Sequence, residues 1–349
     1  MIDKLEYGFS GNSGLDSRAL SKRILAAYRA ANIQTSEDSS VLWNMIFEKN
    51  RSVHDSIMKG ESIPELDDPA SSNLFYGFDN MFHDFTKTLK ENAEFQLLMA
   101  ENLRATIIVL AEATGAKRPW NPEGGAKFPH KEKPDADSIE NLLKAISSII
   151  GVEVDFPNPF PTEFGIITSR GIASHRSIQA IYQAWRLKTL SVDHGKRIVE
   201  VGAGLGRTAY YACKMGLTEY TIIDLPFTNI SQANFLGRVL PPGLVSLFGE
   251  ELQGATVRIL PWTAIEEVEE FDILANVDSL TEVGKETSTR YAHFFAKKGR
   301  LLWSVNHEAN HETVAMLEPL KGLSIGRFPY WFRTGYVEEL YLTPRRPKY

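Results

Sequence analysis

The chain has 349 residues, a net charge of −6 and one cysteine, and 43% of its residues are hydrophobic. This length is more than a single core usually fills, so we expect two domains. The negative charge without a long basic run argues against a nucleic-acid partner, and no apolar run reaches the roughly 18 residues of a membrane helix. A lone cysteine excludes an intramolecular disulfide and a thiolate metal cluster. The first residues lack a signal-peptide core, which predicts a cytoplasmic protein with no membrane partner.

The first half of the chain has helical periodicity. Apolar residues recur at helical spacing over residues 20–31, 41–58, 79–114, 138–150 and 174–190. Asp137 or Ser138 stands at the N-cap position of the fourth of these helices. The preceding segment, 118–137, is dense in Pro, Gly and Lys, which predicts a loop. We therefore predict a helical N-terminal domain over residues 1–165.

From residue 197 onward, short β-branched runs alternate with helical stretches. The runs cover residues 198–201, 220–223, 256–260, 271–275 and 300–305. Two further runs, 323–332 and 336–342, flank a turn-prone RTG and predict an antiparallel pair. The alternation predicts an α/β fold, a Rossmann-like, doubly wound parallel sheet with helices on both faces, within a domain of residues 166–349.

The most informative segment is RIVEVGAGLGRTAYYA, Arg197 to Ala212. A strand ends at an acid, Glu200, and gives way to three glycines and then to a helix. The glycines are Gly202, Gly204 and Gly206. A turn of this kind accepts an adenosine-type ligand, because side chains there would crowd the ligand and the following helix offers free amides.

Two details favour S-adenosylmethionine (SAM) over a dinucleotide. The dinucleotide pattern needs a small residue where Arg207 stands, and the acid Glu200 suits a cationic ligand. Asp224 ends the second strand eighteen residues beyond Gly206, close to the offset at which an acid binds ribose hydroxyls. The alternative for Asp224 is a helix N-cap.

Three more residues complete the predicted donor site. Leu225 follows the ribose acid, Trp262 ends the third strand beside the expected adenine, and Asn276 ends the fourth strand. Core packing is an alternative for Trp262.

Polar residues also follow the fourth and fifth strands, where a doubly wound sheet opens its ligand crevice. They are Asn276, Asp278, Ser279 and Glu282 after the fourth, and Asn306, His307, Glu308 and Asn310 after the fifth. Histidine suits general-base work near neutral pH, so His307 is the predicted base, with Asp278 or Glu308 orienting it or the acceptor. The alternative for Asp278 is a helix cap.

A metal is not predicted, although two carboxylates and a histidine could hold a divalent cation. The string His307-Glu308-x-x-His311 matches a zinc pattern that requires a helix, and here it begins at a strand end. Upstream of the first strand, Arg170, His175 or Arg176 could contact the donor carboxylate, with a solvated helix face as the alternative.

With EVGAGLGR, IIDLP, NVDSLTE and SVNHEAN in place, the chain resembles the class I SAM-dependent methyltransferases. More narrowly it resembles the sugar O-methyltransferases found near glycan and antibiotic biosynthesis genes, a similarity that extends to VLWNMIFEKN, LFYGFDNMF and IQAIYQAWRL. The resemblance implies methyl transfer from SAM to a hydroxyl of a sugar, nucleotide sugar or glycosylated natural product. It also implies that the helical domain acts as a lid and acceptor-binding wall.

Three alternatives stay open: a methyltransferase of an aromatic or polyketide acceptor, a SAM-binding subunit without catalysis, and a nicotinamide oxidoreductase. Glu200 and Arg207 argue against the last. The sequence does not determine the oligomeric state, and a homodimer is compatible with it.

Overall fold

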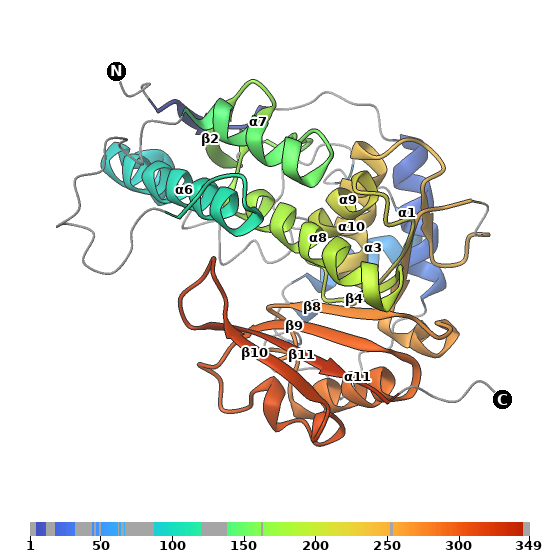
Figure 1. Cartoon of the computed structure of the whole chain (residues 1–349). Coiled ribbons are helices and arrows are strands. Elements are labelled where there is room, and N and C mark those ends of the chain that lie inside the picture. The colour runs from blue at the N-terminus through green and yellow to red at the C-terminus, as the bar shows by residue number, and fades with distance from the viewer. Residues whose placement is uncertain are drawn as a thin grey trace.

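The structure is a computed structural model that describes residues 5–11, 18–31, 44, 47–48, 50–61, 63, 66, 87–119, 138–161, 163–251 and 254–344. Its centre is an eight-stranded sheet with helices on both sides (Figure 1). The strands are β4 (Arg197–Val201), β5 (Glu219–Asp224), β6 (Val245–Leu247), β7 (Val257–Pro261), β8 (Ile273–Val277), β9 (Leu301–His307), β10 (Ser324–Pro329) and β11 (Tyr336–Leu342).

The order of the strands is that of a doubly wound sheet. The sheet runs β10-β11-β9-β8-β4-β5-β7-β6, parallel from β9 to β6, with β11 antiparallel to β9 and to β10. The chain moves from β4 to β5 and β7 on one side and later returns to β8 on the other. The crossover places the topological switch point between the ends of β4 and β8. The predicted fold class is confirmed, including its antiparallel strand pair.

Helices cover the two faces of the sheet separately. On one face lie α9 (Arg207–Lys214) and α10 (Pro226–Val239), and on the other lie η4 (Trp262–Glu267) and α11 (Lys285–Lys298). Two short turns, η5 (Val314–Met316) and η6 (Glu318–Leu320), precede β10. Each face has its own hydrophobic core: the first lies under α9 and α10, and the second lies under η4 and α11. Adjacent residues of β4 point to opposite faces, so Ile198 packs in the first core and Val199 in the second.

The N-terminal helices extend the first of these cores. They are α1 (Arg18–Ala30), α3 (Arg51–Lys59), α6 (Ala93–Thr114), α7 (Ile139–Ile150) and α8 (His175–His194). Helix α1 packs against α10, and α6 packs against α7 and α8. A small antiparallel sheet joins β1 (Tyr7–Phe9), β2 (Phe164–Thr168) and β3 (Gly171–Ala173). The boundary between two domains at residue 165 stays a prediction.

The predicted helices that lie within the described residues are present. Ser138 caps α7 by accepting from the Asn141 amide at 3.2 Å, and Ser174 caps α8. The sequence missed β6 and the three strands of the small sheet, because runs of three to five residues give little periodic signal. Four predicted or quoted segments lie partly or wholly outside the described residues. They are the loop 118–137, the start of the helix 79–114, and the segments 41–50 and 74–82.

In the described part of the chain, every helix falls short of the length and apolarity needed to cross a membrane.

Candidate active site

The glycine turn between β4 and α9 lies at the switch point. Gly202, Gly204 and Gly206 have φ angles of 72°, 54° and 86°, which glycine adopts without strain. A Cβ on Gly202 would lie 2.1 Å from the Ser279 Oγ, and one on Gly206 would lie 2.9 Å from Leu236 Cδ1. A Cβ on Gly204 would meet no atom within 4 Å. Packing thus excludes a side chain at Gly202, Gly206 lies against the flexible end of Leu236, and of the three only Gly204 borders open space that a ligand could fill.

Two carboxylic acids end the strands beside this turn, and both are buried. Glu200 is 2% exposed, and its Oε2 accepts a hydrogen bond from the Tyr220 hydroxyl at 2.8 Å. Asp224 accepts from the Leu225 amide at 2.8 Å and from the Gln232 side chain at 2.6 Å. Burial raises the pKa of each acid to about 7, and the neighbouring Asp224 adds to the rise at Glu200.

These raised pKa values predict that stability falls as the pH rises. In the folded protein both acids bind a proton more tightly than in the unfolded chain, where their pKa values are 4.5 and 3.8. Between about pH 4 and pH 7 the unfolded state therefore loses protons first, and their contribution to the free energy of unfolding declines. Thermal unfolding of the ligand-free protein from pH 4.5 to 8 measures this decline.

Glu200→Gln removes one of the two titrating groups, so its melting temperature should fall less over the same pH range. Glu61→Gln, an exposed position after α3, should follow the wild type. An equal slope for Glu200→Gln and the wild type would contradict the raised pKa at Glu200.

Arg207, which the sequence used against a dinucleotide, has a packing role. Its guanidinium lies 2.6 Å from a carboxylate oxygen of Glu163 and donates to the Ser174 hydroxyl at 3.3 Å, and all three residues are buried. The pair fastens the start of α9 to the segment before β2 and to the start of α8. The side chain therefore points away from the turn's open side.

Arg207→Met should destabilise the protein by about 3–5 kcal/mol, because it leaves the Glu163 carboxylate buried without its cation. Urea denaturation measures the loss. The double variant Arg207→Met with Glu163→Met should recover part of it, and no recovery would contradict the ion-pair explanation.

Asn276 belongs to a buried polar network that ties the strand ends together. It is 0% exposed, and its Nδ2 donates to the Val201 carbonyl at 2.9 Å and to the Ser279 hydroxyl at 2.5 Å. Its Oδ1 accepts from Asn306 Nδ2 at 2.8 Å, and Asn306 in turn accepts from the Ser279 amide at 3.2 Å. These residues fix the ends of β4, β8 and β9, and contact of Asn276 with a donor stays a prediction.

Asp278 lies directly after β8 and is held by two side chains. Its φ is 61°, a left-handed conformation that is uncommon for a residue with a Cβ. Arg333 Nη1 donates to Oδ2 at 2.6 Å, and the Tyr336 hydroxyl donates to Oδ1 at 2.8 Å. The Asp278 carboxylate is thus charge-compensated and held in a fixed orientation.

His307 ends β9 and faces Glu282. The Ala309 amide donates to His307 Nδ1 at 3.2 Å, which leaves the ring proton on Nε2. That nitrogen lies 3.6 Å from Glu282 Oε1. Burial and the charge of Asp278 raise the pKa of Glu282, while His307 opposes the rise. Glu282, which the sequence ranked lower, is the acid that the structure places beside His307.

Glu308 lies in the bend that follows β9 and points away from Glu282. Its carboxylate accepts from Arg327 Nη2 of β10 at 2.5 Å, at the surface. His311 lies in a bend, so the zinc-pattern string lacks its helix. Asp278, Glu282 and His307 offer ligand atoms within 4.8 Å of one another, but Arg333 already supplies a cation to Asp278.

Of the three upstream candidates, His175 and Arg176 reach this site. Both side chains are exposed, yet surrounding protein and two guanidinium groups, Arg176 and Arg333, lower the pKa of His175 to about 4. The charge of Asp278 raises the pKa of Arg176, and the charge of Arg333 lowers it. Arg170 instead donates to Ser147 and to a carbonyl, away from the site.

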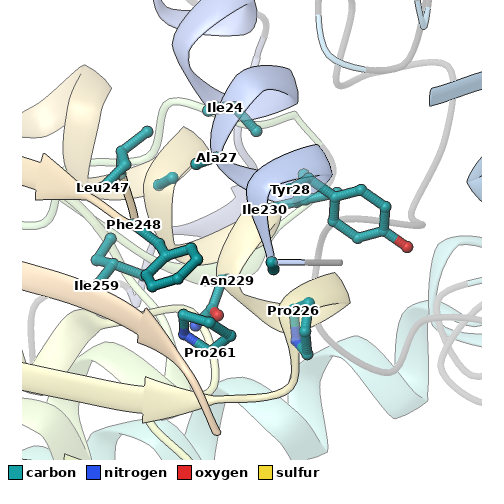
Figure 2. Close-up of a pocket in the computed structure, with 12 residues that line it drawn as sticks. Ile24, Ala27, Tyr28, Pro226, Asn229, Ile230, Leu247, Phe248, Ile259 and Pro261 are labelled. Atoms are coloured by element: carbon teal, nitrogen blue, oxygen red, sulfur yellow. The ribbon is translucent and has the colours of Figure 1, made fainter. Parts of the chain in front are cut away.

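A small pocket of about 20 Å³ lies between α1, α10, β6 and β7 (Figure 2). Pro226 lines it two residues after Asp224, and Pro261 lines it from the strand position opposite Asp224. The other lining residues are mostly apolar and come from α1, α10, β6 and β7. Trp262 packs against the core that contains η4 and α11, with the Arg290 guanidinium 5.5 Å from its ring centre, and its contact with adenine stays a prediction.

Arg333 and Tyr336 are site residues that the sequence reading treated only as a turn and a strand start. Because β11 is antiparallel to β9, its first residue, Tyr336, lies opposite His307. The predicted antiparallel pair already indicated this position. The turn between its two strands must lie at the edge of the sheet where the parallel strands end.

No family model and no curated protein matches the chain. Among solved structures it is similar to a candidate RNA methyltransferase from Pyrococcus horikoshii, with 13% identity, 50% of this chain and 84% of that chain covered, and a TM-score of 0.35. It is also similar to magnesium protoporphyrin IX methyltransferase from Synechocystis with bound SAM, with 10% identity, 49% and 80% coverage, and a TM-score of 0.34. A candidate SAM-dependent methyltransferase from Streptococcus mutans has 10% identity, 58% and 64% coverage, and a TM-score of 0.35. At these values the functional argument depends on the residues described above.

Proposed function

We propose that the chain is a SAM-dependent methyltransferase that methylates a hydroxyl group of a sugar-like acceptor. The observation that carries the proposal is the left-handed glycine turn at the switch point, flanked by two buried acids. Glu200 lies one residue before the end of β4 and Asp224 ends the neighbouring strand β5, and a side chain on Gly204, in the turn after β4, would meet open space. This arrangement suits a donor that carries a ribose and a cationic group.

The residues present fit SAM. Asp224 ends β5 beside the glycine turn, where an acid can accept from ribose hydroxyls, and donors from within the protein, among them Leu225 and Gln232, hold its carboxylate in place. The apolar side chains that begin at Pro226 and Pro261, next to Asp224, are of the kind that packs against a flat heterocycle such as adenine. Glu200 contributes negative charge beside the glycines whenever it is ionised. When bound, SAM supplies a methyl group on a sulfonium centre.

The acceptor hydroxyl attacks that methyl carbon, so that a C–O bond forms as the C–S bond breaks and S-adenosylhomocysteine (SAH) leaves. The hydroxyl proton passes to the Glu282–His307 pair, the group with a free acceptor oxygen beside the site. In this pair His307 Nε2–H faces the carboxylate, so Glu282 accepts the proton and His307 steadies the charge. Asp278, held by Arg333 and Tyr336, orients the acceptor.

The sugar-like acceptor is the finer part of the proposal, and polar side chains support it. Asp278, Glu282, His307 and Arg333 surround the position that an acceptor would take, and all can hydrogen-bond to hydroxyls. A purely apolar aromatic acceptor would leave several of these groups unsatisfied.

Calorimetric titration with SAM, SAH and NAD tests the donor, and labelled SAM with a panel of nucleotide sugars, glycosylated natural products and aromatic phenols tests the acceptor. SAM and SAH should bind and NAD should not. Binding of NAD alone would overturn the proposal. Label transfer only to phenols would show that the acceptor is aromatic and not sugar-like. Binding of SAM without any transfer would favour a non-catalytic SAM-binding subunit.

A further inference from the structure

Two side chains of α10 form a short hydrogen-bonded chain that ends at Asp224, the predicted ribose acid. Gln232 Nε2 donates to Asp224 Oδ2 at 2.6 Å, and Asn229 Nδ2 donates to Gln232 Oε1 at 2.9 Å. Positions 229 and 232 are three residues apart in the helix, so both side chains lie on one face of it. The chain therefore runs along this face from Asn229 through Gln232 to the acid.

Gln232 lies where a polar side chain is costly. It is 0% exposed, and Ala233 and Leu236 of the same helix belong to the hydrophobic core. A buried amide is tolerated when both its donor and its acceptor have partners, as they do here. Helix capping does not explain the contact with Asp224, because the N-cap position of α10 is occupied by Leu225.

Asn229 orients the Gln232 amide. An amide has a donor end and an acceptor end, whereas an ionised carboxylate only accepts. Because Asn229 donates to Gln232 Oε1, the Gln232 Nε2 is the end that faces Asp224. Asn229 also lines the small pocket together with Pro226 and Pro261 (Figure 2). The hydrogen-bonded chain thus joins the wall that we assign to adenine with the acid that we assign to ribose.

We propose that Gln232 and Asn229 are positioning residues that hold the Asp224 carboxylate in the orientation that accepts the ribose hydroxyls of the donor. The inference rests on the proposed methyltransferase function and adds to it the residues that set the affinity for the ribose. Gln232 is fully buried, so it acts through Asp224 rather than by touching the donor. Its bond is made to a carboxylate, and such charge-assisted hydrogen bonds are stronger than neutral ones.

The test compares SAH with its 2′,3′-dideoxy analogue, in which hydrogen replaces both ribose hydroxyls, by calorimetric titration into the full chain. The wild type should bind SAH at least tenfold more tightly than the analogue. Gln232→Met keeps the length of the side chain and removes the donor to Asp224. Its Kd for SAH should rise about tenfold, while its Kd for the analogue should change less than twofold.

Asn229 offers two further variants, which leave Gln232 in place. The carboxylate of Asn229→Asp can only accept, so Gln232 turns its Nε2 toward position 229 and its Oε1 toward Asp224. The Kd for SAH should rise at least tenfold, again with little change for the analogue. In Asn229→Ala the Gln232 amide can still donate to Asp224, so both Kd values should change less than threefold.

Asn234→Leu is the matched control. It removes another buried amide from α10, one whose Oδ1 accepts from Arg238 Nε at 2.7 Å. The ratio of the two Kd values should equal that of the wild type.

Three results would overturn the inference while SAH still binds. Equal weakening of SAH and the analogue in Gln232→Met would mean that Gln232 supports the fold of the site and does not position Asp224. Unchanged ratios in Gln232→Met and Asn229→Asp would exclude the chain from ribose binding. Equal affinity of the wild type for both ligands would show that Asp224 is not the ribose acid. Should Gln232→Met unfold, the contrast between Asn229→Asp and Asn229→Ala decides.

Failure of the wild type to bind SAH at all is a different result. It would count against the methyltransferase function itself, and the inference would fall with it.

Discussion

Gly202→Ala should unfold readily, whereas Gly204→Ala should fold and lose its affinity for SAH. At Gly202 the new Cβ would lie 2.1 Å from the Ser279 hydroxyl in a backbone with φ of 72°, so the ends of β4 and β8 must separate. We expect a loss of about 3 kcal/mol or more in the free energy of unfolding, in the range of overpacked and strained positions. Urea denaturation measures this loss.

Gly204→Ala carries only the cost of a left-handed alanine, about 1–2 kcal/mol. Its Cβ would enter the open space that we assign to the donor, so the Kd for SAH should rise at least tenfold. Gly243→Ala is the matched control, because Gly243 has φ of 86° and open space but precedes β6. It should show the same stability cost without a change in SAH affinity. If Gly204→Ala and Gly243→Ala bind SAH equally, the donor lies elsewhere.

Glu282→Gln should lower kcat by about 100-fold or more with the acceptor that the panel identifies, which is the range for loss of a general base. The amide cannot accept the hydroxyl proton, although it keeps the shape of the side chain. The wild-type kcat should rise with pH as Glu282, whose pKa is raised by burial and by Asp278, becomes ionised. That rise should be absent in Glu282→Gln, and the Kd for SAH should stay the same.

Glu308→Gln provides the comparison, since Glu308 pairs with Arg327 at the surface. We expect less than a twofold change in kcat. The reverse result, with a large loss in Glu308→Gln and a small one in Glu282→Gln, would return the orienting role to Glu308 as the sequence proposed. Equal small losses would leave His307 as the base.

Long-range placement explains why Glu308 rather than Glu282 was favoured from the sequence. Glu308 is adjacent to His307 along the chain, but the chain bends after β9 and Glu308 pairs with Arg327 at the surface. Glu282 is 25 positions before His307, and only the parallel pairing of β8 with β9 brings the segments that follow them together. Tyr336 is likewise brought opposite His307 by antiparallel pairing.

By itself, the sequence determined the doubly wound sheet, its antiparallel strand pair and the glycine turn. These follow from local signals: β-branched runs, helical periodicity and glycines at positions that need a positive φ. The tertiary structure decided which side chains meet at the switch point. It turned Arg207 inward to Glu163, paired His307 with Glu282 and fastened Asp278 to Arg333 and Tyr336. Those contacts join residues tens of positions apart, and strand order and register, which local patterns do not encode, bring them together.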